Sequence, residues 1–320
     1  MNAGRLIAVV VTHNRLAKLR VCVAALLAEP AERLAGLVVV DNASDDGTAD
    51  WLAGLCDPRC HVLTLAHNTG GAGGFAAGLR HAAEVLDADW VLILDDDARP
   101  LPGALTRFHA TPRDGHAAWA AKVCYPSGEL CEMNRPSRNP FWHAASFWRT
   151  LRAGRAGFHV SDAEMHGSAP VEIDVASFVG LFVSRAAIAQ AGLPDPALFI
   201  HGDDVLYCLA IRRAGGRIAL DPGLHFEHDC ESLSPDLKVY TPLWRAYYRH
   251  RNALLTYRAA AGRWLFWPVA AVVVPRWFAL SRHYGPNRAA FRRVLRAAVR
   301  DGLRGDTSRA HEDVLTLCGP

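Results

Sequence analysis

The chain has 320 residues, of which 51% are hydrophobic and 21% charged, and its formal net charge is +3. This composition is typical of a globular protein with a sizeable core, and the lack of biased or periodic tracts excludes disordered and repeat architectures. At this length we expect one or two domains.

The start of the chain and the cysteines favour a cytoplasmic protein. The apolar run 6–11 is too short for a secretory signal, and polar residues follow it instead of a small-residue cleavage site. The eight cysteines include no CxxC pair. Such spacing in a long chain indicates reduced thiols, most of them small buried side chains.

The first hundred residues alternate between buried-strand and helix patterns. Continuous apolar runs predict strands over 6–11, 37–40, 62–65 and 90–94. The predicted helices are 15–28, a helix that Ser44 caps and that runs through Trp51, and 75–86 after the glycine-rich loop 68–74. Repeated strand–helix units with fully apolar strands predict a parallel sheet that is covered on both faces.

Polar residues follow each of these four strands. They are Thr12–Asn14, Asp41–Asn42, His67–Asn68 and Asp95–Asp97. In such sheets ligands bind beyond the carboxyl ends of the strands. We therefore expect four segments of the chain to converge on one crevice.

The remainder of the chain is less regular. Residues 130–170 predict a long loop region, because they contain prolines, arginines and aromatics without a clear period. The predicted elements after it are a strand over 175–184, a helix over 203–214, a strand over 217–220 with a turn at 221–223, and helices from about residue 242.

Asp95, Asp96 and Asp97 give the sharpest chemical signal. A strand that ends in three carboxylates places like charges close together, which is costly without a cation. Hard divalent cations such as Mg²⁺ and Mn²⁺ take oxygen ligands and leave positions open for substrate phosphates. A solvated acidic turn is the alternative, but the three other polar strand ends favour a metal site.

Three further segments leave two interpretations open. The segment 68–74 lacks the P-loop and GxGxxG patterns, so it is either a tight turn or a phosphate-approach loop at a helix N-terminus. Asp203 and Asp204 begin a helix. They are either ordinary acidic residues that the helix dipole stabilises, or they include a general base. His228 is either structural or a metal ligand, since no second pair with zinc spacing accompanies it.

The charge is divided unevenly along the chain. Residues 241–310 contain 14 Arg, no Lys and only two acids, so this segment carries +12 and the rest of the chain −9. The division predicts an acidic catalytic body and a basic C-terminal surface. Nucleic-acid binding is not expected, because no recognised nucleic-acid motif accompanies the arginines.

The basic segment also contains apolar patterns. Residues 264–274 form an apolar run that Pro275 stops, and it is shorter than the roughly 20 residues that span a bilayer. Residues 286–304 predict a basic helix with Phe291, Leu295 and Val299 on one face. Arginine and tryptophan on such segments predict peripheral membrane contact over 263–304, and a core helix with a solvated basic side is the alternative.

Taken in order, several segments resemble glycosyltransferase family 2, whose members have the GT-A fold. These segments are residues 9–15, 38–48, 68–75, 95–97, 201–207 and 247–252. The resemblance covers roughly residues 6–255. The glycine-rich loop together with the acidic triplet is most similar to the galactofuranosyltransferase and rhamnosyltransferase branch.

The resemblance implies a metal site and a base. Asp95 and Asp97 should bind Mn²⁺ or Mg²⁺, and His228 should complete the metal shell, with His225 as its competitor. Asp204 should be the catalytic base.

The resemblance also implies a donor site. Asp203 should orient the acceptor or the donor sugar, and Asp96 should lie near the ribose or the sugar. The other donor-binding residues that it implies are Thr12, His13, Asn14, Arg15, Asp41, Asn68, Gly71, Gly73, Gly74 and Arg80.

The implied activity is a metal-dependent, inverting sugar transfer. The donor would be a UDP- or dTDP-sugar, with galactofuranose the first choice and rhamnose the second. The acceptor would be a glycan or a lipid-linked glycan in bacterial cell-surface polysaccharide synthesis, at the inner face of the cell membrane. Residues 1–240 would form the catalytic domain, with donor (1–100) and acceptor (101–240) halves, and residues 241–320 a helical basic region.

Three rival functions remain. A phosphatase of the haloacid dehalogenase type needs Asp-x-Asp-x-Thr/Val, but Ala98 and Arg99 follow Asp97 here. A non-catalytic protein that binds sugar nucleotides or polysaccharides would not need the triplet together with Asp204. A nicotinamide-dependent dehydrogenase is the weakest rival, because its glycine fingerprint is missing.

Overall fold

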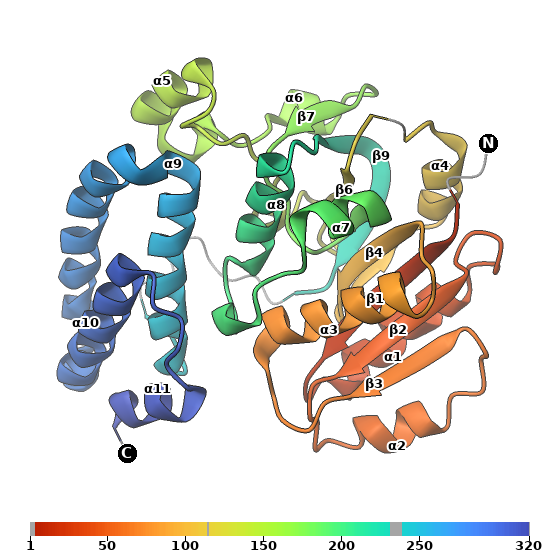
Figure 1. Ribbon diagram of the computed structural model, residues 1–320, viewed down its shortest axis with the longest axis horizontal. Coiled ribbons are helices and arrows are strands. Elements are labelled where there is room, and N and C mark those ends of the chain that lie inside the picture. Colours follow the sequence, from red (N-terminus) through yellow and green to blue (C-terminus); the bar gives the residue numbers. More distant parts are fainter. Residues whose placement is uncertain (1–3, 114, 231–238, 320) are drawn as a thin grey trace.

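The computed structural model describes residues 4–113, 115–230 and 239–319. The strands in these residues are β1 (Leu6–Thr12), β2 (Gly36–Asp41), β3 (Cys60–Thr64), β4 (Trp90–Asp95), β5 (Ala98–Pro100), β6 (Ala118–Cys124), β7 (Val171–Ile173), β8 (Leu181–Ser184) and β9 (Ile218–His228). They form one sheet in the order β3-β2-β1-β4-β8-β6-β9-β5, and β7 pairs with β9. The predicted α/β architecture is confirmed, with helices around the sheet and a helical C-terminal region beside it (Figure 1).

The helices include several that sequence patterns did not predict. The α-helices are α1 (Leu16–Leu27), α2 (Thr48–Ala53), α3 (Gly70–Glu84), α4 (Ala104–Ala110), α5 (Ala144–Ala153), α6 (Asp162–Met165), α7 (Arg185–Ala191), α8 (Asp203–Arg213), α9 (Trp244–Ala279), α10 (Arg288–Arg304) and α11 (His311–Cys318). The 3₁₀ turns are η1 (Glu132–Asn134), η2 (Gly154–Gly157), η3 (Pro196–Leu198), η4 (Leu280–His283) and η5 (Gly285–Asn287).

The N-terminal half of the sheet is parallel and buried on both faces. Leu6, Ala8 and Val10 of β1 pack in one core cluster with α1, while Ile7 and Val9 pack in a second cluster with α3. The alternation along β1 therefore places α1 and α3 on opposite faces of the sheet. This double burial explains why the strands are continuous apolar runs.

The register of the parallel strands brings their polar ends to one edge. Thr12 lies beside Asp41 on β2, and Val11 lies beside Asp95 on β4. Asp41 in turn lies beside Thr64 at the end of β3. The predicted convergence of the carboxyl ends is confirmed.

The glycine-rich segment is mostly helix, which corrects the predicted loop over 68–74. α3 begins at Gly70, and two of its glycines face β1. A Cβ on Gly74 would lie 2.5 Å from Val11 Cγ1, and a Cβ on Gly78 would lie 2.3 Å from Val9 Cγ1. The glycines thus let the helix backbone rest directly on the strand, a packing reason that outweighs the low helix propensity of glycine.

The helix after β2 begins later than predicted. Gly47 precedes its first residue, Thr48, and Ser44 does not cap it. Asp46 instead binds the first residue of the helix: its Oδ1 accepts hydrogen bonds from the Thr48 N–H at 3.2 Å and from the Thr48 hydroxyl at 2.6 Å. The Ser44 hydroxyl instead accepts the N–H of Asn14 at 3.0 Å, and so joins two of the polar strand ends.

The region predicted as a long loop, 130–170, contains two helices and two 3₁₀ turns. Its last short helix, α6, begins with a capping box between Ser161 and Glu164, a local signal that periodicity does not detect. The strand predicted over 175–184 is shorter than expected. Only β8 is strand, and it begins just after Gly180, which has φ +72°.

The turn predicted at 221–223 is a bulge within a longer strand. β9 continues to His228, and its register against β6 shifts between Ala121 and Lys122. Asp221 at the bulge is fully buried, and its carboxylate accepts hydrogen bonds from Arg107 and Arg113. The bulge therefore keeps a polar turn inside the sheet without ending the strand.

α9 is a helical hairpin and not one straight rod. Gly262 has non-helical angles (φ 70°, ψ 178°), and the two halves of the helix lie side by side. The His250 and Trp277 ring centroids are 4.9 Å apart, and the Arg258 guanidinium lies 4.5 Å from the Phe266 ring centroid, which is the pattern of antiparallel neighbours. The stretch Trp244–His283 is long and apolar enough to cross a membrane by composition, but the kink divides it.

One expectation for the C-terminal region is wrong. The helix itself runs past Pro275 to Ala279. The apolar face of α10, with Phe291, Leu295 and Val299, is buried against α9 in a separate core cluster, so it does not face a bilayer. For α10 the alternative of a core helix with a solvated basic side is correct.

We expect Gly78→Ala to lower the free energy of unfolding by about 1–3 kcal/mol, because overpacking of a dense core costs this much. The new Cβ would lie 2.3 Å from Val9 Cγ1 and 3.1 Å from Val40 Cγ2, both on packed strands. Urea-induced unfolding would measure the loss. Gly71→Ala is the control, since the nearest atom to its new Cβ is Phe75 Cε2 at 3.9 Å. Equal destabilisation by the two changes would contradict the packing argument.

Candidate active site

The acidic triplet lies at the end of β4, and Arg15, which immediately precedes α1, supplies its counter-charge. Arg15 Nη1 lies 2.9 Å from Asp96 Oδ1, and Arg15 also forms an ion pair with Asp97. The Thr12 hydroxyl donates a hydrogen bond to Asp96 Oδ2 at 2.7 Å. Asp96 and Asp97 are buried and Asp95 is partly exposed, so the structure brings the triplet, Thr12 and Arg15 together as one charged group.

The three carboxyl groups differ in how readily they ionise. Burial raises the pKa of Asp95, and it raises the pKa of Asp96 to about 7 in spite of the nearby Arg15. Burial also disfavours the charge on Asp97, but the hydrogen bonds and charges of His228 and Arg15 outweigh it and lower the pKa of Asp97. Buried carboxyl groups at this spacing fit a site that a cation completes.

His228 reaches this group from the end of β9, where it pairs with Ala98 of β5. Its Nε2 lies 3.0 Å from Asp97 Oδ1, and its Nδ1 lies 2.7 Å from Asn134 Oδ1. Burial would lower the pKa of His228, but Asp97 and Cys131 raise it to about 10. Asp95, Asp97 and His228 offer ligand atoms within 4.8 Å of one another, which fits a divalent cation.

The competing ligand His225 lies elsewhere. Its Nε2 lies 2.9 Å from the carbonyl oxygen of Pro222, within the bulge of β9. His225 is not among the residues that converge with the triplet. The geometry therefore favours His228 over His225 as the third metal ligand.

The end of β2 presents an acceptor atom that lacks a partner. Asp41 Oδ1 accepts the N–H of Ser44 at 3.0 Å, whereas its Oδ2 is buried and has no hydrogen-bond partner among the described residues. An unpaired buried oxygen is costly, which fits a ligand that donates a hydrogen bond to it. His13 lies nearby, with Nδ1 2.9 Å from the carbonyl oxygen of Asn42.

The polar residues around the start of α3 mainly hold its backbone. Asn42 Oδ1 accepts the Thr69 N–H at 2.9 Å, and Asn42 Nδ2 donates to the Gly70 carbonyl at 2.8 Å. Asn68 Oδ1 accepts the Gly70 N–H at 2.8 Å, and a Cβ on Gly73 would lie 2.4 Å from Thr69 Oγ1. Asn42 therefore positions this helix start, a role that sequence patterns did not give it.

Of the other residues predicted to bind the donor, some lie at the carboxyl edge of the sheet and one does not. A Cβ on Gly71 would meet only Phe75 Cε2, at 3.9 Å, which leaves its backbone accessible to a ligand. The Asn14 Oδ1 accepts the N–H of Asp45, so it braces the loop after β2. Arg80 lies ten residues beyond the start of α3, about 15 Å along the helix, and its side chain is exposed. The structure does not place Arg80 at the carboxyl edge.

α8 directs two carboxyl groups toward the triplet. Asp203 and Asp204 form its first turn after Gly202, which has φ +79°. Burial raises the pKa of Asp203 to about 8 and that of Asp204 to about 6, and the charge of Asp95 contributes to both. The N–H of Val205 partly offsets the shift at Asp204 by donating to its Oδ1 at 2.7 Å. A carboxylate with a pKa near 6 suits general-base catalysis near neutral pH.

The first half of α9 holds the loop that precedes α8. Asn252 Nδ2 lies 2.9 Å from the carbonyl oxygens of Leu198 and Ile200 and 2.8 Å from that of His201. Both Asn252 and its neighbour Arg251 are fully buried, and Arg251 Nη2 donates to the Ala197 carbonyl at 2.7 Å. These two residues therefore fix the entry into the helix that carries Asp203 and Asp204.

The same loop also touches the donor side of the site. The N–H of Ala72 in α3 donates to the Phe199 carbonyl at 3.2 Å, and a Cβ on Gly70 would lie 2.0 Å from that oxygen. Phe199 and His201 both have left-handed backbones, with φ +64° and +69°. Strained backbone between two site elements is typical of functional positions.

Sequence reasoning missed several residues at this edge. Arg251 and Asn252 were noted only within a segment of family resemblance, because the other arginines of the same helix give no sign in the sequence of which one is buried. Asn134, Cys131 and Cys230 contact or neighbour His228, and two of them lie in the region predicted as loop. Their contacts depend on tertiary structure that spacing alone does not reveal.

Comparison with known proteins identifies the family. Residues 7–167 match the family model of Glycosyl transferase family 2. The chain belongs to this family. This membership confirms the predicted enzyme class, a glycosyltransferase.

Curated relatives fall in the predicted branch. The chain is 31% identical to galactofuranosyltransferase GlfT1 of Mycolicibacterium smegmatis over 65% of each chain, and 31% identical to GlfT1 of Mycobacterium tuberculosis over 70% of each. It is 26% identical to the dTDP-rhamnosyl transferase RfbF of Shigella flexneri, over 78% of this chain and 79% of that one. The chain thus spans about two thirds of the length of the GlfT1 relatives.

Solved structures confirm the GT-A fold. A mannosyltransferase from Pyrobaculum calidifontis, in complex with GDP-Man and Mn²⁺, superposes with a TM-score of 0.52 at 17% identity, over 94% of this chain and 87% of that one. S. aureus TarS 1–349, in complex with UDP-GlcNAc, gives 0.54 at 12% identity, over 95% and 93%. These likenesses establish the fold, and the roles of individual residues remain predictions.

We expect Asp203→Asn to stabilise the protein at alkaline pH. The folded-state pKa of Asp203, about 8, lies above its ordinary value of 3.8, so the protonated acid favours folding. That contribution is present below about pH 4 and is lost as the pH rises through 8. In the absence of divalent cations, the variant should melt a few degrees above wild type at pH 8, with the difference shrinking toward pH 4.

Thermal unfolding measured across this pH range would check the expectation. Asp45→Asn is the matched control, because Asp45 is exposed in the loop after β2 and its replacement should change the Tm little across this pH range. A Tm of Asp203→Asn that stays below wild type at pH 8 would show that Asp203 is ionised without cost in the folded protein.

Proposed function

We propose that the protein transfers galactofuranose from a nucleotide-diphosphate donor to a glycan or glycolipid acceptor, with inversion at the anomeric carbon. Rhamnose is the second candidate sugar, because the relatives include a dTDP-rhamnosyl transferase as well as galactofuranosyltransferases. The observation that carries the proposal is the meeting of two acidic groups, Asp95–Asp97 and Asp203–Asp204, at one edge of the sheet.

Asp95, Asp97 and His228 would hold the cation, Mn²⁺ or Mg²⁺. A bound cation supplies charge neutralisation for the diphosphate leaving group. Asn134 supports this assignment because it fixes the His228 ring through Nδ1, leaving Nε2 toward the carboxylates. Mn²⁺ is present in the solved mannosyltransferase of the same fold.

Residues at the ends of β1 and β2 would bind the nucleoside. The unpartnered Asp41 Oδ2 supports this role, since it can accept a hydrogen bond from the base or the ribose. Thr12, His13 and Asn14 border the same edge. Arg15 is 43% exposed and bound only at its tip, so it can turn from Asp96 and Asp97 toward the diphosphate when a cation takes its place.

Asp204 would be the catalytic base. Its pKa near 6 leaves it ionised at neutral pH, ready to take the proton of an acceptor hydroxyl. The hydroxyl oxygen then attacks the anomeric carbon from the face opposite the diphosphate, and one displacement inverts the configuration. Burial and the neighbouring Asp204 raise the pKa of Asp203, so Asp203 would orient a sugar hydroxyl as a protonated acid by hydrogen bonding.

The rival functions are less well supported. Asp97 is engaged by Arg15 and His228 in an ion-pair network, whereas a phosphatase of the haloacid dehalogenase type needs an aspartate nucleophile followed by a spaced Thr or Val. A non-catalytic binding protein would not need a base with a shifted pKa beside the cation ligands. Turnover separates these possibilities.

The tip of the α9 hairpin supports a membrane-associated acceptor. Trp264 and Trp267 are 77% and 57% exposed, close to the exposed Arg263. α5 lies beside this tip (Figure 1), where Asn139 Nδ2 donates to the Ala260 carbonyl at 3.0 Å. Aromatic and cationic side chains in one exposed patch suit the interface of an anionic bilayer. We infer that this tip contacts the inner face of the cell membrane, where a lipid-linked acceptor would lie.

We expect the wild-type protein to release nucleotide from UDP-galactofuranose, or failing that from dTDP-rhamnose, when Mn²⁺ and a membrane glycolipid extract are present. Asp97→Ala should lower turnover by about a thousandfold through loss of cation binding, and Asp204→Asn by a factor of about 10²–10⁴ through loss of the base. Nucleotide release with the donor panel would measure both effects.

Asp45→Asn, which lies outside the acidic groups, should retain full turnover in the same assay. Cleavage of simple phosphomonoesters without sugar transfer would overturn the proposal in favour of a phosphatase. Full turnover by Asp204→Asn would remove Asp204 from the role of base.

We expect the Trp264→Ala, Trp267→Ala double variant to bind anionic phospholipid vesicles at least about tenfold more weakly than wild type, because burying each indole contributes about 1.5–3 kcal/mol. Vesicle co-sedimentation at physiological salt would measure the change. Val85→Ala removes an exposed apolar side chain from α3's far end and should leave binding unchanged. Equal binding by all three proteins would show that the hairpin tip does not contact the bilayer.

A further inference from the structure

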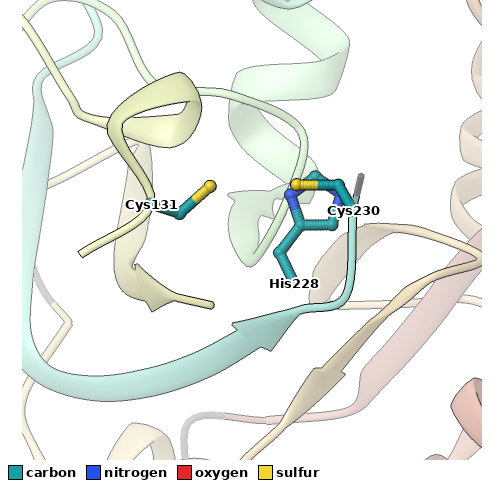
Figure 2. A group of neighbouring side chains, drawn as sticks. All are labelled: Cys131, His228 and Cys230. Atoms are coloured by element: carbon teal, nitrogen blue, oxygen red, sulfur yellow. The ribbon is translucent and has the colours of Figure 1, made fainter. Parts of the chain in front are cut away.

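A second group of metal-ligating side chains lies behind the candidate active site. It consists of Cys131, His228 and Cys230, whose ligand atoms all lie within 4.8 Å of one another. Figure 2 shows the Cys131 sulfur directed toward His228 from the segment before η1, while Cys230 follows His228 at the end of β9. Both cysteines are free thiols.

Asn134 shows which side of the imidazole faces the thiols. The Cys131 thiol donates to Asn134 Oδ1 at 2.9 Å, and His228 Nδ1 lies 2.7 Å from the same oxygen. The opposite ring nitrogen, Nε2, lies 3.0 Å from Asp97. One imidazole therefore has two polar neighbours: Nε2 faces the carboxylate of Asp97, and Nδ1 shares Asn134 Oδ1 with the Cys131 thiol.

We propose that Cys131, Cys230 and His228 Nδ1 form a second metal site, which takes a thiophilic divalent cation such as Zn²⁺. Sulfur and imidazole ligands select zinc over the hard cations that carboxylates prefer. With Zn–S near 2.3 Å and Zn–N near 2.0–2.1 Å, tetrahedral ligand atoms lie about 3.5–3.8 Å apart, so the three groups need to approach by about 1 Å or less.

Burial at this site favours binding. Cys131 is 2% exposed and His228 is buried, which protects two of the ligands from exchange with solvent. Cys230 is partly exposed and gives a cation a path inward. Three protein ligands leave the fourth tetrahedral position to water, as in open zinc sites.

The two metal sites exclude each other. A neutral imidazole has one nitrogen with a free lone pair, while the other carries a hydrogen. When zinc takes Nδ1, the hydrogen is on Nε2 and points at Asp97, so His228 cannot ligate the donor cation. A thiophilic cation in the second site therefore inhibits transfer, a consequence that rests on the proposed function, whereas the binding itself does not.

Cobalt titration of the purified full-length chain, stripped of metal by chelation, tests the site directly. Co²⁺ bound by thiolates gives a sulfur-to-cobalt charge-transfer band, and we expect it to saturate near one equivalent and to disappear when Zn²⁺ is added. Cys131→Ser and Cys230→Ser should each abolish the band. Cys56→Ser, at an exposed cysteine outside the group, should retain it.

Cys230→Ser is the more decisive variant, because a partly exposed side chain contributes little to the core and its replacement should leave the fold intact. Circular dichroism would verify the fold of every variant. Absence of the band in wild type would overturn the proposal. So would a band that persists in both Cys131→Ser and Cys230→Ser.

A turnover assay then tests the exclusion through His228. Zn²⁺ should inhibit Mn²⁺-dependent nucleotide release by wild type and by Cys56→Ser, and at least about tenfold more Zn²⁺ should be needed for Cys131→Ser and Cys230→Ser. Equal zinc sensitivity in all four proteins would overturn the exclusion. If no donor turns over, the proposed function fails while the cobalt band still decides whether the site exists.

Discussion

Repulsion between buried carboxyl groups is the constraint around which this molecule is organised. Asp95–Asp97 and Asp203–Asp204 meet at one edge, and burial together with the charges of neighbouring carboxylates raises the pKa of four of these five groups. Arg15 and His228 offset part of this cost, and a cation would offset more. The buried carboxyl groups therefore lower the stability of the fold, as is common for active sites, and packing elsewhere must compensate for this loss.

Close packing on either side of the carboxyl edge of the sheet compensates for this loss of stability. Gly74 and Gly78 let α3 rest on β1, which places the donor side. Arg251 and Asn252 of α9 bind the backbone of residues 197–201 and so place the start of α8, which carries Asp203 and Asp204. Neither set of contacts includes the five carboxyl groups, yet both determine where those groups lie.

Much of the donor half could be predicted from the sequence, because its signals are local. The apolar runs of β1, β2 and β4 and the polar residues after them define the sheet and its edge, and the triplet stands out on composition alone. What could not be predicted depends on contacts between distant segments. Asn134 meets His228 across 94 positions, and the buried face of α10 looks like a bilayer-binding face until α9 covers it.

The contacts of Arg251 and Asn252 have a consequence for how this protein could be divided. A boundary near residue 240 separates the sheet from the C-terminal helices, and a fragment ending there would keep the whole donor edge. It would also lose every hydrogen bond that α9 makes to residues 197–201. Such a fragment would keep the acidic triplet yet lose the contacts that order the start of α8, so the C-terminal helices are a structural support of the candidate site and not a separable attachment.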